Sequence, residues 1–183
     1  GNETHDHEAR DDESSFYTDA ISDQAAEFVR RHQDTHADKP FFQYVAYTAP
    51  HWPLHAHPED IEKYRGRFDD GWDRLREERL ERMVSDGLVH PDWKLTDRDP
   101  TQPEWSAAEN KAWLLRCIEV YAAQIDRMDQ GIGRILDALE DTGQPANTLI
   151  LFLSDNAASA EAIPTARTAE EPVNSLSIPL AAT

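Results

Sequence analysis

The sequence predicts an α/β domain with a parallel sheet and flanking helices, and three stretches carry this prediction. Residues 148–153 form an apolar, partly β-branched run of strand length without polar alternation, which is typical of a strand covered on both faces. Residues 41–48 form a second run of aromatic and β-branched residues. Between them, residues 107–142 show an uninterrupted helical pattern. A strand, a crossover helix and a second strand make a right-handed βαβ unit, in which the two strands are parallel.

The first part of the chain predicts a polar segment, a helix and then a strand. Residues 1–15 are too polar and charged to pack, so we expect a flexible acidic segment, and they lack the apolar core of a signal peptide. Residues 16–32 predict a helix, because their apolar side chains recur on one face and Thr18 or Asp19 can cap it. Residues 41–48 follow as the first strand.

The long insert between the two strands predicts two further helices. Residues 58–64 begin with a proline followed by acids, which favours a helix start. Residues 70–86 carry many charges of both signs, which is typical of a solvated helix with local ion pairs. Residues 87–106 predict a proline-rich loop in which Trp93 and Trp105 serve as aromatic anchors.

The crossover helix has the clearest pattern in the chain. Its apolar residues follow steps of three and four, which predicts a stripe that packs on the sheet. Cys117 lies next to this stripe, and we expect it to be a small buried apolar residue. Gly143 supplies a stop signal for the helix. The stripe consists of Leu114, Ile118, Tyr121, Ile125, Met128, Ile132, Ile135 and Leu139.

These elements divide the chain into three parts. We expect residues 16–156 to form the central domain, preceded by the flexible segment 1–15. Residues 157–183 are rich in Ala, Ser, Thr and Pro without periodicity, so we expect an irregular, disordered tail.

The composition restricts the classes of partner. The chain has 183 residues, with 36 acidic against 18 basic side chains and a formal charge of −18. Such a surface repels nucleic acid and anionic membranes, and it suits a protein that works in high salt. No run has the length of a membrane span, so cellular location stays open. The single cysteine excludes an internal disulfide and a cysteine-based zinc site.

Polar groups follow both predicted strands. His51 lies in a loop stiffened by Pro50 and Pro53, and Asp155 and Asn156 end the second strand. Ligands of open α/β sheets bind outside the carboxyl ends of the strands. A carboxylate beside an amide oxygen suits a divalent cation such as Ca²⁺ or Mg²⁺, although the same two residues are also common in turns.

Four stretches resemble the sulfatase family, in particular the arylsulfatases: residues 47–54, 64–79, 121–134 and 147–156. The resemblance implies an alkaline-phosphatase-like α/β fold and hydrolysis of small-molecule or glycan sulfate esters. It also implies a divalent cation, usually Ca²⁺, and a formylglycine made from Cys or Ser. Asp155 and Asn156 match two metal ligands of the family. His51 matches a histidine that binds the substrate sulfate, where it could also protonate a leaving oxygen.

The chain departs from the family at the nucleophile. The motif Cys or Ser-x-Pro-x-Arg is absent, because Cys117 is followed by Ile118-Glu119-Val120 and Ser177-Ile178-Pro179 is followed by Ala181 where arginine is needed. The paired acids that complete the metal site of the family are also absent. The resemblance therefore identifies the middle of a sulfatase catalytic domain, inactive by itself. Two alternatives remain, namely a phosphoester hydrolase of the same superfamily and a non-catalytic acidic binding protein or pseudoenzyme that retains the fold.

Overall fold

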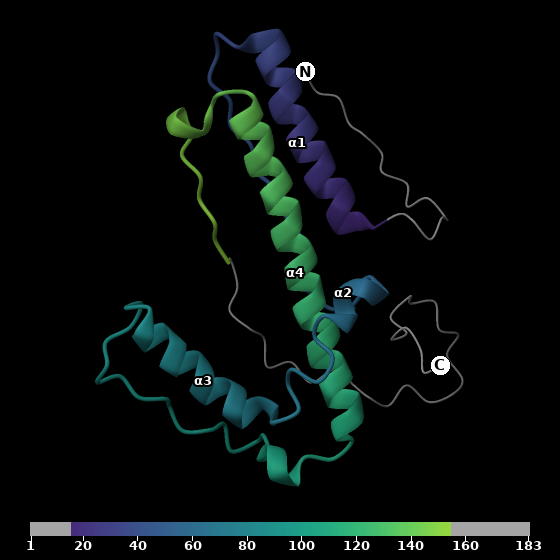
Figure 1. Ribbon diagram of the computed structural model, residues 1–183, viewed down its shortest axis with the longest axis vertical. Coiled ribbons are helices and arrows are strands. Elements are labelled where there is room, and N and C mark those ends of the chain that lie inside the picture. Colours follow the sequence, from purple (N-terminus) through teal and green to yellow (C-terminus); the bar gives the residue numbers. More distant parts are fainter. Residues whose placement is uncertain (1–15, 155–183) are drawn as a thin grey trace. The chain divides into compact units, whose positions relative to one another are not determined.

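The computed structural model of this protein describes residues 16–154 (Figure 1). These residues form the four predicted helices, with ends that differ from the expected ones by a few residues. Two short 3₁₀ turns, which the sequence did not predict, precede and follow the last helix. The elements are α1 (Tyr17–His36), α2 (Pro58–Glu62), α3 (Gly71–Ser85), η1 (Trp105–Ala107), α4 (Lys111–Asp141) and η2 (Pro145–Asn147). None of the helices in this part of the chain is long and apolar enough to cross a membrane.

The chain divides into two compact units. Among the described residues, the first combines residues 16–48 with residues 128–154, and the second consists of residues 49–127. Helix α4 contributes residues to both units. The predicted boundary at residue 15 coincides with the start of the described part, and the one at residue 156 lies just beyond its end at residue 154, so the structure tests neither.

In the first unit, α1 packs on α4 through small side chains. Ala26 and Val29 of α1 form a buried cluster with Ala138 and Leu139 of α4. A Cβ added to Gly131 would lie 2.1 Å from Ser22 Oγ, well inside van der Waals contact. The two helices can therefore approach this closely only because residue 131 has no side chain.

The predicted strands are not formed within residues 16–154. Both segments lie outside regular secondary structure, and no backbone hydrogen bond joins residues 41–48 to residues 149–153. A strand is completed only by a ladder of backbone hydrogen bonds to a neighbour. The first segment instead contacts α1 through side chains: Gln43 Nε2 donates to the Ala25 carbonyl at 3.1 Å, and the Tyr47 and Ser22 hydroxyls lie 2.8 Å apart. The parallel sheet is thus not confirmed.

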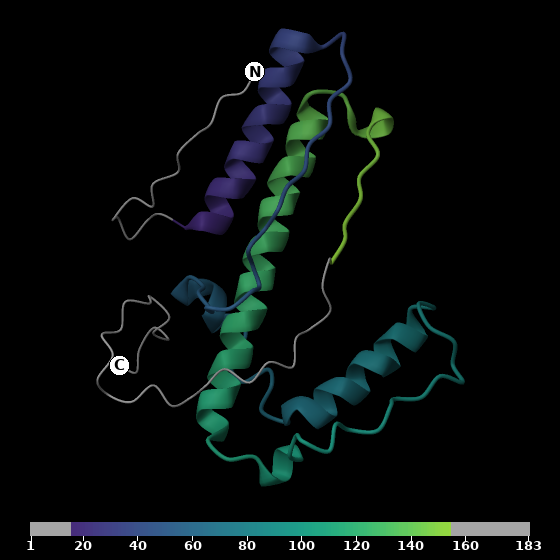
Figure 2. The ribbon, with the colours of Figure 1, turned by 180° about the vertical axis from the view of Figure 1, so that it is seen from behind.

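The course of the chain nevertheless matches the predicted crossover. Residues 41–48 run along α4 in the direction opposite to that helix, and residues 148–154 do the same after the turn η2 (Figures 1 and 2). The two segments are therefore parallel to each other, as the strands of a βαβ unit are. The helix and both segments have the predicted order and direction, whereas the hydrogen-bonded ladder between the segments is missing.

In the second unit, a small apolar cluster holds α2 against the first half of α4. Ala56 and Ile61 pack on Val120 and Ala123, with Leu54 and Tyr64 at the margin. Beside this cluster lies Asp60, which is 2% exposed. A carboxylate buried to this extent requires cationic partners, and the second unit supplies two.

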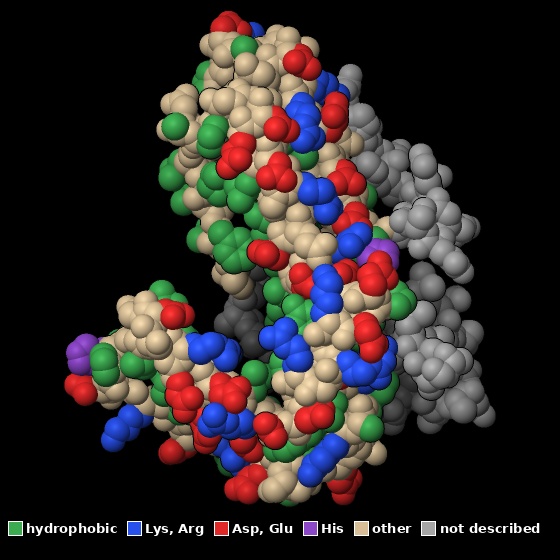
Figure 3. All heavy atoms as spheres, in the orientation of Figure 1, with side chains coloured by type: hydrophobic (Ala, Val, Ile, Leu, Met, Phe, Trp, Pro, Cys, Tyr) green, Lys and Arg blue, Asp and Glu red, His purple; other side chains and the backbone are tan. Residues whose placement is uncertain are grey.

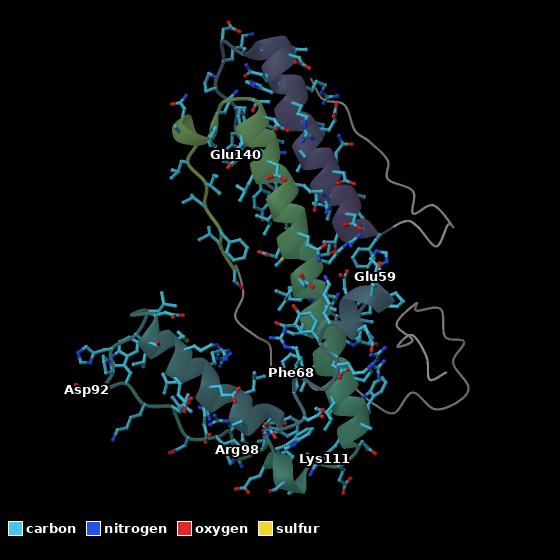
Figure 4. The ribbon with its side chains drawn as sticks, viewed as in Figure 1. Glu59, Phe68, Asp92, Arg98, Lys111 and Glu140 are labelled. Carbon is cyan, nitrogen blue, oxygen red and sulfur yellow. The ribbon has the colours of Figure 1, made fainter. Side chains whose placement is uncertain are left out.

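Helix α3 and the returning segment form an arm of the second unit. Residues 86–104 run back along α3. Asp92 lies near the C-terminal end of α3, and Arg98 lies beside the helix (Figure 4). Arg98 pairs with Asp73 at 3.0 Å, and the Trp105 ring meets the Trp72 ring edge-on at 4.8 Å. Trp105 therefore serves as the expected anchor, whereas Trp93 is exposed and the prediction for it is wrong.

The apolar stripe of α4 is also only partly covered. Tyr121 and Ile125 are 44% and 37% exposed, although Leu139 is buried. The buried face is centred instead on Val120, Ala123, Gly131 and Ala138, about a third of a turn away. Helix α1 packs on α4 near Gly131 and Ala138, and α2 packs on it near Val120 and Ala123, because these small residues permit a close approach. The apolar stripe therefore remains on the side of α4 that a sheet would cover.

Candidate functional site

His51 is the one predicted site residue that the described chain contains. It lies in the loop between the segment 41–48 and α2, and its side chain is exposed. Leu54, three residues later, packs at the margin of the apolar cluster of the second unit. The loop is therefore fixed after His51 by burial, while the histidine itself remains open to solvent.

A local hydrogen bond determines how the His51 ring can act. Its Nδ1 lies 2.5 Å from the carbonyl oxygen of Trp52. A carbonyl only accepts, so Nδ1 carries the proton and donates it. In the neutral ring, Nε2 is then an acceptor, and it becomes a donor only when the ring is protonated. His51 can therefore donate a hydrogen bond to an anion as an imidazolium.

The predicted metal ligands Asp155 and Asn156 lie outside the described residues. The chain that leads to them, residues 148–154, is extended and mostly exposed. Within residues 16–154, no three His, Cys, Asp or Glu side chains come close enough together to hold a metal ion.

Cys117 does not have the surroundings of a nucleophile. It lies on α4 and is partly buried. Burial raises the pKa of the Cys117 thiol, which keeps it in the protonated and less reactive form. The sequence predicts that Cys117 is a small buried apolar residue, and the structure buries it only in part.

One charged cluster in the second unit is not evident from the sequence. Lys63 Nζ donates to Asp60 Oδ1 at 2.8 Å and to Asp126 Oδ2 at 2.9 Å. Asp60 Oδ2 accepts no hydrogen bond but lies 3.5 Å from Arg127 Nη1. The hydrogen bond that Lys63 donates to Asp60, and then the one that it donates to Asp126, raise the pKa of Lys63. Asp126 and Arg127 lie within the stretch 121–134 that resembles sulfatases, and the structure places them in a contact between α4 and the α2 region.

A polar hollow between α1 and α4 has a different character. It has a volume of about 250 Å³ and contains the cations Arg30 and Arg134. Arg134 lies 2.9 Å from both Asp19 and Asp23, and Arg30 lies 3.4 Å from Asp141. Each cation is already neutralised by a carboxylate, so the hollow does not attract anions.

Comparison with known proteins identifies clear relatives. The chain matches the Sulfatase family over residues 2–180. It is 36% identical over 169 residues to an uncharacterised sulfatase of Schizosaccharomyces pombe, covering 88% of this chain and 30% of that protein. It is 35% identical over 127 residues to an arylsulfatase of Klebsiella aerogenes, covering 68% and 27%.

A human protein is also similar. The chain is 31% identical over 138 residues to an N-sulphoglucosamine sulphohydrolase of Homo sapiens, covering 70% of this chain and 23% of that protein. The chain therefore spans less than a third of the length of each of these three relatives.

Proposed function

Because this chain belongs to the sulfatase family, we propose that it forms the central part of a domain that hydrolyses sulfate esters. Family membership implies the alkaline-phosphatase-like fold. The observation that carries the proposal is the family match over residues 2–180, within which the exposed His51 loop lies. The substrate class that we propose is an aryl or glycan sulfate ester.

In this proposal His51 contacts the sulfate group. Its Nδ1 is held by the Trp52 carbonyl, so Nε2 is the atom that faces the substrate. Donation from Nε2 needs a protonated ring, and the positive charge then attracts the sulfate dianion or monoester.

Asp155 and Asn156 are the residues that would hold the divalent cation, for which we propose Ca²⁺. When bound, such a cation neutralises sulfate oxygens and stabilises the charge that develops during ester cleavage. Two ligands fall short of the roughly six to eight oxygens that Ca²⁺ takes, so this chain should bind it weakly.

We further propose that residues 41–48 and 148–153 are strands of the parallel sheet of this fold. Their shared direction along α4 supports this assignment (Figures 1 and 2). So does the apolar stripe of α4, which is left without cover on one side. Residues 16–156 are then the central part of the catalytic domain.

The chain as given should not turn over sulfate esters. No residue occurs in the Cys or Ser-x-Pro-x-Arg pattern, and Cys117 is a protonated thiol in a helix. Loss of the nucleophile of a cooperating site removes nearly all of its rate, on the order of 10⁶-fold in a well-studied hydrolase. His51, Asp155 and Asn156 can bind and polarise the anion, but they supply no attacking atom.

The test combines binding and turnover of 4-nitrophenyl sulfate by residues 1–183, with and without Ca²⁺. We expect weak binding that inorganic sulfate displaces, that His51→Ala abolishes and that the control His90→Ala leaves unchanged. His90 is a suitable control because it is an exposed loop histidine. Binding that is insensitive to His51→Ala would contradict the proposed contact. Metal-dependent turnover that disappears in both His51→Ala and Asp155→Ala would show that the chain contains a nucleophile after all.

The absent nucleophile motif favours a second candidate, a non-catalytic protein that retains the fold. The same assay separates the candidates. Tighter binding of 4-nitrophenyl phosphate than of the sulfate would favour a phosphoester hydrolase. Absence of any binding by the chain would favour the non-catalytic acidic protein.

A further inference from the structure

Within the second unit, four charged side chains join the α2 region to α4. Asp60 and Lys63 come from α2 and its C-terminal end, whereas Asp126 and Arg127 come from α4. Lys63 Nζ lies 2.9 Å from Asp126 Oδ2, and Arg127 Nη1 lies 3.5 Å from Asp60 Oδ2. Each element therefore contributes one acid and one base, and each of these ion pairs crosses between the elements. We call these four residues the α2–α4 cluster.

The contacts of the α2–α4 cluster lie inside the second unit. Asp60 is 2% exposed, and the side chains of Asp126 and Arg127 are 21% and 23% exposed. In Figure 3 acidic and basic side chains lie side by side over the α2 region and the first half of α4. Because both partners of each ion pair belong to this unit, the pairing does not depend on which other segments cover it.

Helix α2 needs these contacts to keep its position. It has five residues, and a helix of this length is not stable without tertiary contacts. Its apolar contact joins Ala56 and Ile61 to Val120 and Ala123, and the two alanines offer little shape that would fix a register. Opposite charges at fixed spacing do fix it, because a shift of α2 along α4 would separate both ion pairs. The charges therefore determine where α2 lies on α4.

Helix α2 in turn holds the end of the loop that carries His51. The His57 carbonyl accepts hydrogen bonds from the backbone N–H groups of Asp60 and Ile61, at 3.0 Å and 3.1 Å. The preceding residue, Ala56, is buried. Residue 57 is thus fixed to the first turn of α2, and only residues 52–56 separate it from His51. A displacement of α2 would therefore be transmitted to the loop through this short connection.

We propose that Asp60 is a positioning residue for His51. Held by Lys63 and Arg127, it fixes α2 on α4. The loop then keeps the conformation in which His51 Nδ1 donates to the Trp52 carbonyl, which leaves Nε2 for the sulfate. The inference rests on the proposed function for the contact between His51 and sulfate, whereas the state of the ring can be measured without any ligand.

The test is the nitrogen-15 NMR spectrum of the histidine rings of residues 1–183, recorded without ligand in alkaline solution, where imidazole is neutral. The ring shifts report which nitrogen carries the proton, and His51→Ala identifies the signals of His51. In the unchanged chain we expect the Nδ1–H form of His51 to dominate. Asp60→Asn should give a mixture of both forms, whereas Glu59→Gln, at the exposed neighbour, should leave the spectrum unchanged. A residue that only stabilised the fold would not alter this ratio in the folded chain.

Further variants separate positioning from loss of the fold. Arg127→Gln should act as Asp60→Asn does, and the two together should change the His51 ratio no more than either alone, because both break the same ion pair. Arg127→Lys keeps the positive charge and should retain most of the Nδ1–H form. Circular dichroism shows whether each variant keeps its helices. If Asp60→Asn does not, Lys63→Gln tests the same cluster, because the Lys63 side chain is 48% exposed and Asp60 keeps Arg127.

Two results would overturn the proposal. One is an Nδ1–H form of His51 that persists in every folded variant of the cluster. The other is an equal change in the signals of His90, an exposed loop histidine, because it would indicate general loosening. Titration with inorganic sulfate then tests the link to function, and we expect Asp60→Asn to raise the dissociation constant about tenfold, as the loss of one hydrogen bond to a charged group does. Failure of the unchanged chain to bind sulfate would contradict the proposed contact of His51, while the ring spectra would still decide whether Asp60 positions it.

Discussion

At the scale of single residues, two positions determine how the helices pack. Gly131 lets α1 approach α4 closely enough for Ser22 to lie where a Cβ would be. Asp60 places a carboxylate inside the second unit, where Lys63 and Arg127 neutralise it. Both residues act through close contacts, so even a conservative substitution at either position should lower the free energy of unfolding.

Gly131→Ala should destabilise the chain, whereas Gly133→Ala should not. The new methyl group at residue 131 would meet Ser22 Oγ at 2.1 Å and the Tyr47 hydroxyl at 3.1 Å, and overpacking of this kind costs about 1–3 kcal/mol. A Cβ at residue 133 meets nothing within 4 Å, so the better helix propensity of alanine should stabilise the chain by up to about 1 kcal/mol. Urea unfolding followed by circular dichroism measures both, and equal effects of the two substitutions would contradict the close contact.

Asp60→Asn should also destabilise the chain, with Glu59→Gln as its control. The neutral amide leaves Lys63 and Arg127 without their buried counter-charge, for which we expect a loss of about 1–3 kcal/mol. The loss stays moderate because the Lys63 side chain is 48% exposed and can be solvated. Glu59 is the exposed neighbour of Asp60, so its substitution should stay within about 0.5 kcal/mol. The same unfolding experiment applies, and a loss at residue 59 as large as that at residue 60 would contradict the assignment.

At the scale of elements, α3 depends on one aromatic contact. Gly71, at the start of α3, has φ +75° and lies directly against the Trp105 ring, where a side chain would not fit. The Trp105 backbone N–H donates to Asp73 Oδ2 at 2.8 Å, and the Trp72 indole donates to the Pro103 carbonyl at 3.3 Å. The charged remainder of α3 contributes mainly exposed ion pairs, which are worth little.

Trp105→Ala should therefore loosen α3 while leaving α1 unaffected. We expect hydrogen exchange of the α3 amides to accelerate at least about tenfold, which corresponds to roughly 1.4 kcal/mol of local stability. Trp93→Ala is the matched control, because Trp93 is 63% exposed. Exchange that accelerates equally in α1 and α3 would indicate global unfolding and would contradict the local role of Trp105.

At the scale of the whole molecule, net charge opposes the small core. Within residues 16–154 the buried apolar residues form two short clusters, whereas the whole chain carries 36 acidic side chains against 18 basic ones. Repulsion among the carboxylates favours expanded conformations, and salt screens it over a distance of about 10 Å at 0.1 M and 3 Å at 1 M.

Salt should consequently stabilise the fold. We expect the urea midpoint of residues 1–183 to rise between low salt and about 1 M KCl, since screening removes more repulsion from the compact state than from the expanded one. Urea is used because it is uncharged and leaves the ionic strength unchanged. A midpoint that stays constant or decreases would show that charge repulsion does not limit stability, and it would argue against the high-salt interpretation.

The sequence by itself determined the four helices, the order and direction of the predicted strand segments, and the acidic surface. It also determined the resemblance that the family match confirms. These features depend on local periodicity, on turn residues and on short motifs, all of which can be seen without knowing what lies next to them in space. The position of His51 in an open loop follows from the same local information, because the flanking prolines exclude a helix.

Only the tertiary structure decided which face of α4 is buried and which groups neutralise Asp60. The apolar stripe that contains Tyr121 and Ile125 is the clearer pattern in the sequence, yet α1 packs at Gly131. A close approach between two helices depends on the side-chain sizes of both helices at once, which the pattern of one helix does not show. The strand segments remained without a ladder for a related reason. Their composition favours extended backbone, but backbone hydrogen bonds need a second chain segment at the right distance, and no local pattern specifies that partner.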